Sequence, residues 1–326
     1  MRQIFAFNGD ADGLCALQQL RLAEPGTASA ELVTGVKRDI ALLARVRAGA
    51  GDRLTVLDVS LDVNRQGLLA LLAAGVAVRY FDHHFAGEIP QQGQLEVHID
   101  PSPNVCTSVL VDRALGGKYQ RWSVVGLFGD SLTDEGRALA AVAGLPPDAT
   151  EQLKELGVAL NYNDYGESVA DLHVPPVELA AEMLPYADPL EFAASSSTFR
   201  RVADGYREDM DKARRLEPMR KVAGAIVYLL PDAAWCRRAS GTLANDLAKA
   251  NLGSAVAIVS HKTNGGLLVS IRVPAASPTS AEVFCRQFPT GGGRRTAAGI
   301  NDLPSAELDR FAALFEAQFR VSQRRD

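Results

Sequence analysis

The sequence predicts an α/β protein of two domains, and three observations lead to this expectation. The chain has 326 residues, about the length of two ordinary domains. Apolar residues make up 47% of it and charged residues 22%, which is typical of a globular protein with buried cores. In the first half, short apolar runs alternate with segments of helical periodicity, and this alternation indicates a parallel sheet with helices on both faces.

The expected elements of the first half follow in chain order. We expect strands at residues 4–7, 54–59 and 76–81, and helices at residues 14–23, 68–74 and 107–115. An apolar run at 124–127 leads into Asp130, and residues 134–192 are expected to be mostly helical, with breaks at paired prolines. The charged stretch 199–220 is expected to form a helix that links the two domains.

The second half has a pattern of its own. It predicts strands at residues 225–230, 255–260 and 267–273, helices at 240–250 and 306–319, and a glycine-rich loop at 291–293. We therefore expect a first domain over 1–195, a linking helix over 196–222 and a smaller α/β domain over 223–326.

Charge and cysteine content narrow the function classes. The net charge of −5 argues against a broad basic face that grips long nucleic acid, but it leaves room for a short phosphorylated substrate. The cysteines form no CxxC pair, so we expect four reduced thiols, at Cys15, Cys106, Cys236 and Cys285. The N-terminus resembles no signal peptide, and no apolar run is long enough to span a membrane, so we expect a cytoplasmic protein.

Acidic residues follow the first two predicted strands. Asp10 and Asp12 stand two positions apart, and an extended backbone would point both carboxylates to the same side. Oxygen ligands of this kind suit Mg²⁺ or Mn²⁺. A solvated turn rich in glycine and aspartate is the alternative for this pair, and a helix cap is the alternative for Asp58.

The run Asp82-His83-His84 follows the third strand. It holds two of the five histidines of the chain, and a neutral imidazole is a common metal ligand whose tautomer a nearby carboxylate can fix. Ligands bind beyond the carboxyl ends of parallel strands, so these clusters and Asp130 are expected to meet at one sheet edge. The sequence thus predicts a metal centre there.

Together these residues resemble a known family, the DHH phosphoesterases of the RecJ-like and nanoRNase-like superfamily. The resemblance rests on Asp10-Ala11-Asp12-Gly13, Asp58, Asp82-His83-His84 and Asp130, in that order. A second signature, GGGHxxAAG of the DHHA1 domain, is similar to Gly291-Gly292-Gly293-Arg294-Arg295-Thr296-Ala297-Ala298-Gly299. The resemblance implies a parallel-sheet N-terminal DHH domain, a smaller C-terminal α/β DHHA1 domain and an active-site cleft between them.

The resemblance also implies roles for single residues. It makes Asp10, Asp12, Asp58, His83 and Asp130 metal ligands, with Asp58 bridging two Mn²⁺ or Mg²⁺ ions. Two such ions activate a water molecule and stabilise the attacking and leaving oxygens of an in-line displacement. His84 would contact the scissile phosphate or donate a proton, and Asp82 would orient a neighbour or act as a further ligand.

Two departures from the family pattern affect these expectations. The family commonly has a histidine two or four positions before Asp10, where this chain has Asn8 and Ala6. An amide is a poorer ligand for Mn²⁺, so we expect Asn8 to weaken one of the two ion sites, with His98 as an alternative ligand. The second departure is Arg294, which stands where the signature has histidine.

The second domain is predicted to bind the substrate phosphate. The predicted contacts are Arg272, Gly292, Gly293, Arg294 and Arg295, through guanidinium groups and glycine amides. For Arg295, a basic surface loop is an equal alternative. The run Asn161-Tyr162-Asn163-Asp164-Tyr165 is expected either to line the cleft or to form an ordinary turn.

The leading hypothesis is a metal-dependent phosphoesterase for short oligonucleotides, dinucleotides or nucleoside phosphates. One rival is a nucleotide sensor that has lost turnover through Asn8 and Arg294, and another is an inorganic pyrophosphatase or exopolyphosphatase. We expect no long nucleic acid and no membrane as partner, and a homodimer is left open.

Overall fold

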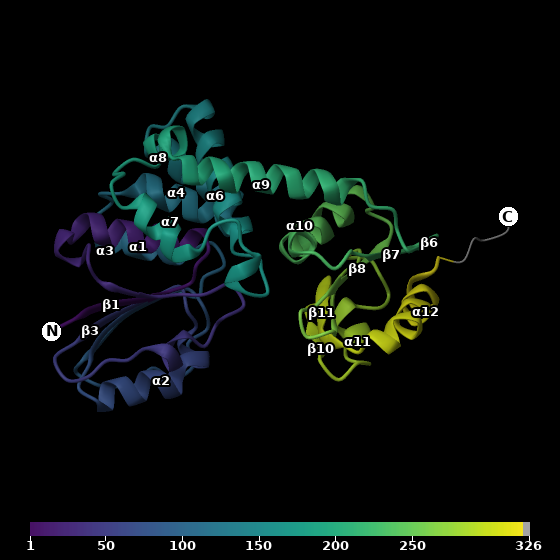
Figure 1. The fold of residues 1–326 in the computed structure, drawn as a ribbon, viewed down its shortest axis with the longest axis horizontal. Helices are drawn as coiled ribbons and strands as arrows, with labels where there is room; N and C mark the ends of the chain where they lie inside the picture. The colour runs from purple at the N-terminus through teal and green to yellow at the C-terminus, as the bar shows by residue number, and fades with distance from the viewer. Residues whose placement is uncertain (322–326) are drawn as a thin grey trace. The chain divides into compact units, whose positions relative to one another are not determined.

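The structure, a computed structural model, describes residues 1–321 and divides the chain into two compact units, Met1–Tyr206 and Arg207–Asp326. Helix α9 (Ser197–Arg214) crosses the division between them (Figure 1). Within residues 1–321 no helix is both long and apolar enough to cross a membrane.

The first unit contains a parallel sheet of five strands in the order β2-β1-β3-β4-β5. The strands are β1 (Gln3–Phe7), β2 (Glu31–Val33), β3 (Arg53–Leu57), β4 (Ala77–Asp82) and β5 (Leu95–Ile99). Its helices are α1 (Ala11–Ala23), α2 (Leu61–Ala73), α3 (Thr107–Ala114), α4 (Gln120–Gly129), α5 (Thr133–Val142), α6 (Pro147–Asn163), α7 (Pro176–Met183) and α8 (Pro189–Ser195). The predicted parallel sheet is confirmed.

Successive side chains of β1 point to opposite faces of the sheet, and both faces are buried. Phe5 and Phe7 pack in one core with α1, α3 and α4, whereas Ile4 and Ala6 pack in a second core with α2. Figure 1 shows α2 on one side of the sheet and the other labelled helices of the first unit on the opposite side. Each buried face keeps its strand in register, because a slip of one residue would exchange the two sets of side chains.

Two glycines let α4 pack closely on its neighbours. A Cβ at Gly126 would lie 2.1 Å from Ser108 Oγ on α3, and a Cβ at Gly129 would lie 2.4 Å from Ala11 Cβ on α1. Real side chains do not approach so closely, so only glycine fits at both positions. This close packing brings the C-terminal end of α4 to the start of α1.

The second unit contains a mixed sheet of six strands in the order β10-β11-β9-β8-β7-β6, in which β7 and β8 are parallel. Its elements are β6 (Arg220–Val222), β7 (Ala225–Leu229), α10 (Ala234–Ala250), β8 (Ala255–His261), β9 (Leu267–Arg272), α11 (Ala281–Cys285), β10 (Gly291–Gly293), β11 (Ala297–Leu303) and α12 (Leu308–Phe319). A cluster of phenylalanines from α11 and α12 fills its core around Phe284.

The apolar run before Asp130 forms part of helix α4. The structure corrects one sequence expectation. The glycine run 291–293 is not a loop, because it forms strand β10 and pairs with β11, with Gly292 opposite Gly299. Glycine is needed there for packing, since a Cβ at Gly293 would lie 2.4 Å from Ala298 Cα.

Candidate metal centre

Asp10 has extended backbone, whereas Asp12 already lies in helix α1, so the backbone does not stay extended through this pair. Asp10 is the N-cap of α1, and its Oδ1 accepts hydrogen bonds from the amides of Asp12 and Gly13 at 3.0 and 3.1 Å. Asp12, the second residue of the helix, accepts hydrogen bonds from the amides of Thr107 and Ser108 at 2.6 and 2.8 Å. Both carboxylates are buried and are held by backbone N–H groups.

Asp58 follows β3 and has a left-handed backbone with φ of 57°. Its amide still donates to the carbonyl of Phe81 at 3.0 Å, so β3 and β4 remain paired up to this residue. Its Oδ1 accepts a hydrogen bond from Thr107 Oγ1 at 3.2 Å. Left-handed backbone is costly for a residue with a Cβ, and such conformations gather at functional sites.

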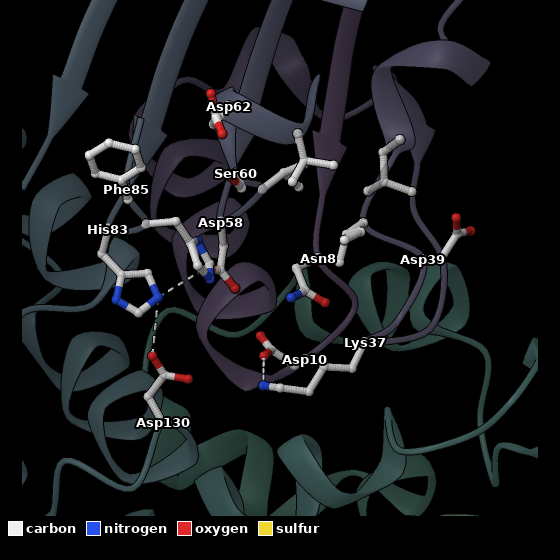
Figure 2. Close-up of a pocket in the computed structure, with 15 residues that line it drawn as sticks. Asn8, Asp10, Lys37, Asp39, Asp58, Ser60, Asp62, His83, Phe85 and Asp130 are labelled. Atoms are coloured by element: carbon white, nitrogen blue, oxygen red, sulfur yellow. Dashed lines mark hydrogen bonds and ion pairs between the residues drawn. The ribbon is translucent and has the colours of Figure 1, made fainter. Parts of the chain in front are cut away.

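His83 is oriented by the backbone. Its Nδ1 lies 3.0 Å from the carbonyl oxygen of Val105, which can only accept, so Nδ1 carries a proton. The other ring nitrogen, Nε2, lies 3.3 Å from Asp58 Oδ1 and 3.4 Å from Asp130 Oδ2 (Figure 2). This arrangement points the Nε2 atom, the usual ligand atom of a neutral imidazole, at two carboxylates.

Asp130 ends α4 as its C-cap. The next residue, Ser131, has φ of 64°, and its amide donates to Phe128 O at 3.2 Å while the amide of Leu132 donates to Leu127 O at 2.9 Å. This is the Schellman arrangement that ends many helices. It turns the chain so that the Asp130 carboxylate reaches His83 from the helical layer.

These groups form a donor set suited to a divalent cation. One ligand atom from each of Asp12, His83 and Asp130 lies within 4.8 Å of the others, and the same holds for Asp58, His83 and His84. Carboxylate oxygen with imidazole nitrogen is a combination that Mn²⁺ accepts, and carboxylate oxygen suits Mg²⁺. The donor set therefore fits such an ion.

The pKa shifts at the cluster also support a bound divalent cation. Burial, with Asp10 and Asp12 close by, raises the pKa of Asp58 well above its ordinary value, and burial with the same neighbours raises the pKa of Asp130 to about 7. Burial disfavours the charged form of His83, but Asp58, Asp12 and Asp130 outweigh it and raise its pKa to about 10. The cluster thus holds protons, which reduce the repulsion between its carboxylates. A divalent cation would reduce this repulsion further, because it has a higher charge than a proton.

A pocket of about 470 Å³ opens at this cluster. Its wall is formed by Asn8, Asp10, Lys37, Asp39, Ile40, Leu42, Asp58, Val59, Ser60, Asp62, Val63, His83, His84, Phe85 and Asp130. Figure 2 shows Asp10, Asp58, His83 and Asp130 close together, with Asp39 and Asp62 farther out around the pocket. Phe85, directly after the Asp-His-His run, is 74% exposed.

Comparisons with known proteins were made at the level of sequence and of structure. No protein-family model and no curated protein sequence matches the chain. Solved structures do match. A manganese-bound exonuclease RecJ aligns with a TM-score of 0.61 at 21% identity, over 97% of this chain and 89% of that one. The DHH domain of a member of the s1p family of ribosomal proteins aligns with a TM-score of 0.65 at 12% identity, over 98% and 87%. A pGpG-specific phosphodiesterase from Vibrio cholerae aligns with a TM-score of 0.58 at 12% identity, over 98% and 100%.

This chain shares the fold of these proteins. The predicted fold class is thereby confirmed. At these identities the likeness concerns the fold, so activity and substrate are taken up below as proposals.

The first two residues of the DHH motif also interact with the third. Asp82 is fully buried, and its Oδ1 lies 2.6 Å from Nδ1 of His84 and 3.2 Å from the His84 amide. Its other oxygen, Oδ2, has no hydrogen-bond partner among the described residues. The His84 side chain is 46% exposed, and its ring packs edge-on against that of His83 at 4.5 Å. His84 is therefore a half-exposed imidazole whose orientation Asp82 fixes.

On the Asp10 side of the DHH centre lies a residue that the sequence analysis missed, Lys37. Its ammonium forms an ion pair with Asp10 Oδ2 and donates to Asn161 Oδ1 at 3.0 Å (Figure 2). Burial opposes the charge of Lys37, but Asp10 and Tyr165 outweigh it and hold its pKa well above the ordinary value. The residue follows β2, a strand of three residues whose pattern was too short to detect from the sequence.

The remaining candidates of the first unit differ in position. Asn8 lines the pocket beside Asp10. His98 is not in the pocket wall, because on β5 its ring stacks on Phe81 at 4.3 Å and its Nε2 lies 2.6 Å from Glu96 Oε1. The structure thus gives no support to His98 as an alternative ligand.

The predicted phosphate contacts of the second unit meet at one end of its sheet. Arg294 and Ala297 close a tight turn between β10 and β11, with the Arg294 amide donating to Ala297 O at 2.8 Å. Ala297 pairs with Arg272 on β9. Arg294 and Arg295 are exposed, and Arg272 is half-buried, with its Nε donating to Asn245 Oδ1 at 2.8 Å. Gly292 and Gly293 lie in β10, so their backbone belongs to a strand and not to an open cradle.

Proposed function

We propose that this protein is a divalent-metal-dependent phosphoesterase that hydrolyses short oligonucleotides, dinucleotides or nucleoside phosphates. The observation that carries the proposal is the meeting of His83 Nε2 with Asp58 and Asp130, at 3.3 and 3.4 Å, on the wall of a pocket. The DHH fold supports the reaction class, since structures of this fold include an exonuclease bound to manganese and a pGpG-specific phosphodiesterase.

Different residues of the chain would have different roles in the reaction. Asp12, Asp58, His83 and Asp130 would hold the ion, which supplies an activated water and neutralises charge on the phosphate. His84 would donate a proton to the leaving oxygen, because its ring is half-exposed beside the cluster. Asp82 would act as a positioning residue by holding Nδ1 of His84.

Exposed apolar side chains in the pocket wall suit a nucleoside. Phe85 is 74% exposed, Ile40 is 51% exposed and Val63 is 49% exposed, and all three line the pocket. Exposed aromatic side chains stack on bases, and apolar neighbours extend the contact. Pyrophosphate and polyphosphate have no apolar part, so this wall favours a nucleotide over the substrates of the pyrophosphatase rival.

We further propose that Arg272, Arg294 and Arg295, with the glycines of β10, bind substrate phosphate. Support comes from their chemistry and their placement at one end of the second sheet. A guanidinium group can donate two parallel hydrogen bonds to phosphate oxygens, and two of these arginines are exposed.

The deciding experiment is a hydrolysis assay on a labelled dinucleotide with Mn²⁺. We expect release of mononucleotide, with loss of release in Asp58→Ala and normal release in Asp134→Ala, which removes an exposed aspartate of α5. Nucleotide binding without release by the wild-type protein would instead support the sensor. Release of orthophosphate from pyrophosphate, with the dinucleotide left intact, would support the pyrophosphatase rival.

A further inference from the structure

We propose that the ammonium group of Lys37 occupies the place of a second metal ion, so that this centre holds one divalent cation beside a built-in lysine cation. The inference rests on the proposed metal centre and deepens it. It replaces the expectation of two ions, the weaker at Asn8, with a centre of one ion.

The first argument is that Asp10 already has partners for both of its oxygens. Oδ1 accepts two amide hydrogen bonds, from Asp12 and Gly13, and Oδ2 accepts the ammonium of Lys37. The Asp10 side chain is 1% exposed, so water does not compete for these contacts. A metal ion bound at Oδ2 would have to share that oxygen with the Lys37 ammonium, and the two positive charges would repel each other.

The second argument is that Lys37 is held in place from several directions. Its backbone amide donates to Asp164 O at 3.2 Å, and its ammonium donates to Asn161 Oδ1 at 3.0 Å. Nζ also lies 5.7 Å from the ring centre of Tyr165, within reach of a cation–π contact. A lysine with this many contacts is a fixed cation and not a mobile surface chain.

The run Asn161–Tyr165 thereby gains a function that its sequence alone did not reveal. Asn161 Nδ2 donates to the hydroxyl of Tyr165 at 3.3 Å, and this bond turns the amide oxygen of Asn161 toward Lys37. The C-terminal end of α6 thus presents an acceptor and an aromatic ring to the ammonium. Both groups suit a lysine, and neither adds the negative charge that a second metal ion would require.

The third argument compares the two sides of the centre. On the His83 side, Asp12, Asp58 and Asp130 supply three carboxylates, and His83 itself supplies one imidazole. On the other side, the pocket wall contributes Asp10, Asp39 and the neutral amide of Asn8. Lys37 forms an ion pair with Asp10 and Arg45 forms one with Asp39, so both of these acids already have a cation, and a second divalent cation would meet the repulsion of the ammonium.

The test counts Mn²⁺ ions by titration calorimetry and by metal analysis of the desalted full-length protein. We expect one ion per chain for the wild type. We expect two for Lys37→Met, which keeps the length of the side chain without its charge, with the second ion binding at least about tenfold more tightly than any second ion in the wild type. Arg38→Met is the matched control, because it removes the adjacent positive charge, and it should retain one ion.

Electron paramagnetic resonance adds a readout that does not depend on activity. Wild type loaded with Mn²⁺ should give the hyperfine spectrum of an isolated ion, and Lys37→Met the spectrum of a spin-coupled pair. Lys37→Gln provides a second variant should the methionine protein fail to fold. Asn8→His should retain one ion while Lys37 is present, which separates the lysine from the asparagine as the cause.

The outcomes are distinct. Two tightly bound ions in the wild type would overturn the inference and leave the proposed phosphoesterase intact. One ion in the wild type and still one in folded Lys37→Met and Lys37→Gln would overturn it as well. No Mn²⁺ binding by any of these proteins would overturn the metal centre itself, and the lysine inference with it.

Discussion

The carboxylate Oδ2 of Asp12 accepts a hydrogen bond from the backbone N–H of Thr107 at 2.6 Å, although the two residues are 95 positions apart in the chain. A residue proposed to hold metal therefore also caps the N-terminus of a neighbouring helix, since Thr107 is the first residue of α3. The negative charge lies at the positive end of that helix, where it is stabilising.

Replacement of Asp12 by alanine should destabilise the protein even when no metal is present. The change leaves the amides of Thr107 and Ser108 buried without their acceptor, at a cost of about 1–3 kcal/mol. Urea unfolding in the presence of a chelator measures this loss. The exposed Asp134→Ala variant should unfold within about 0.5 kcal/mol of the wild type. Equal stability of Asp12→Ala and wild type would contradict the capping role.

The backbone of Asp58 allows a comparison of two variants that both remove its carboxylate. With φ of 57°, alanine at this position keeps the steric cost of left-handed backbone, whereas glycine does not. We expect metal-free Asp58→Gly to be more stable than Asp58→Ala by about 1 kcal/mol. Thermal unfolding checks this order, which a reversed ranking of the two midpoints would refute. Neither variant should gain stability from added Mn²⁺.

Metal affinity should rise with pH. In the metal-free protein the pKa of His83 is raised to about 10 and that of Asp130 to about 7, and the pKa of Asp58 is also raised well above its ordinary value, so the ion must displace protons from these ligands. Protons held by the free form favour that form as pH falls. The logarithm of the Mn²⁺ binding constant should therefore increase with pH, by at least about one per pH unit above pH 7 and more steeply below it.

Calorimetry in buffers of different ionisation enthalpy gives the number of protons released on Mn²⁺ binding. At least about one proton per ion at pH 8, and more at pH 6, is the expected result. An affinity that stays constant over this range would show that the cluster binds metal without giving up protons.

Removal of the exposed ring of Phe85 should weaken substrate binding more than turnover. Stacking on a base contributes about 1–3 kcal/mol, so Phe85→Ala should raise KM for a dinucleotide about 5- to 150-fold with little change in kcat. A substrate with an abasic ribose in place of the stacked nucleoside should have the same KM for both proteins. The control Val142→Ala removes an apolar side chain that is 76% exposed on α5 and should leave both constants unchanged. An equal rise in KM for the abasic substrate would point away from stacking.

The second unit contains a buried ion pair whose loss should be costly. Asp209 on α9 accepts from the guanidinium of Arg238 on α10, with Oδ2 lying 2.8 Å from Nε and 2.7 Å from an Nη. Asp209→Ala leaves a buried guanidinium without its main counterion, so we expect a loss of about 3–5 kcal/mol. Chemical denaturation measures it, and Asp211→Ala, which removes an exposed acid of the same helix, should cost less than about 0.5 kcal/mol.

Sequence patterns predicted the central strands well and the edge strands poorly. β1, β3 and β4 have buried residues on both faces and are mostly apolar, which makes them easy to recognise. The edge strand β2 has only three residues, and β5 is interrupted by Glu96 and His98. Such strands are defined by their neighbours in space and have little signal of their own.

The candidate site was predictable as a set of residues and not as an arrangement. The strand-end motifs indicated Asp58 and His83 because parallel strands end at one edge. No spacing rule could pair Asp10 with Lys37, 27 positions away, or show that Asp130 reaches the cluster from the end of a helix. Those contacts depend on how α1, α4 and the segment after β2 pack together.

The double use of the aspartates has a consequence for how this chain can diverge. Asp10 caps α1, Asp12 caps α3 and Asp130 ends α4, so natural selection for a folded protein acts on the same residues as selection for chemistry. A descendant that abandoned catalysis would still be under pressure to keep these acids. Retention of the motif in a relative is therefore weak evidence that the relative is an active enzyme.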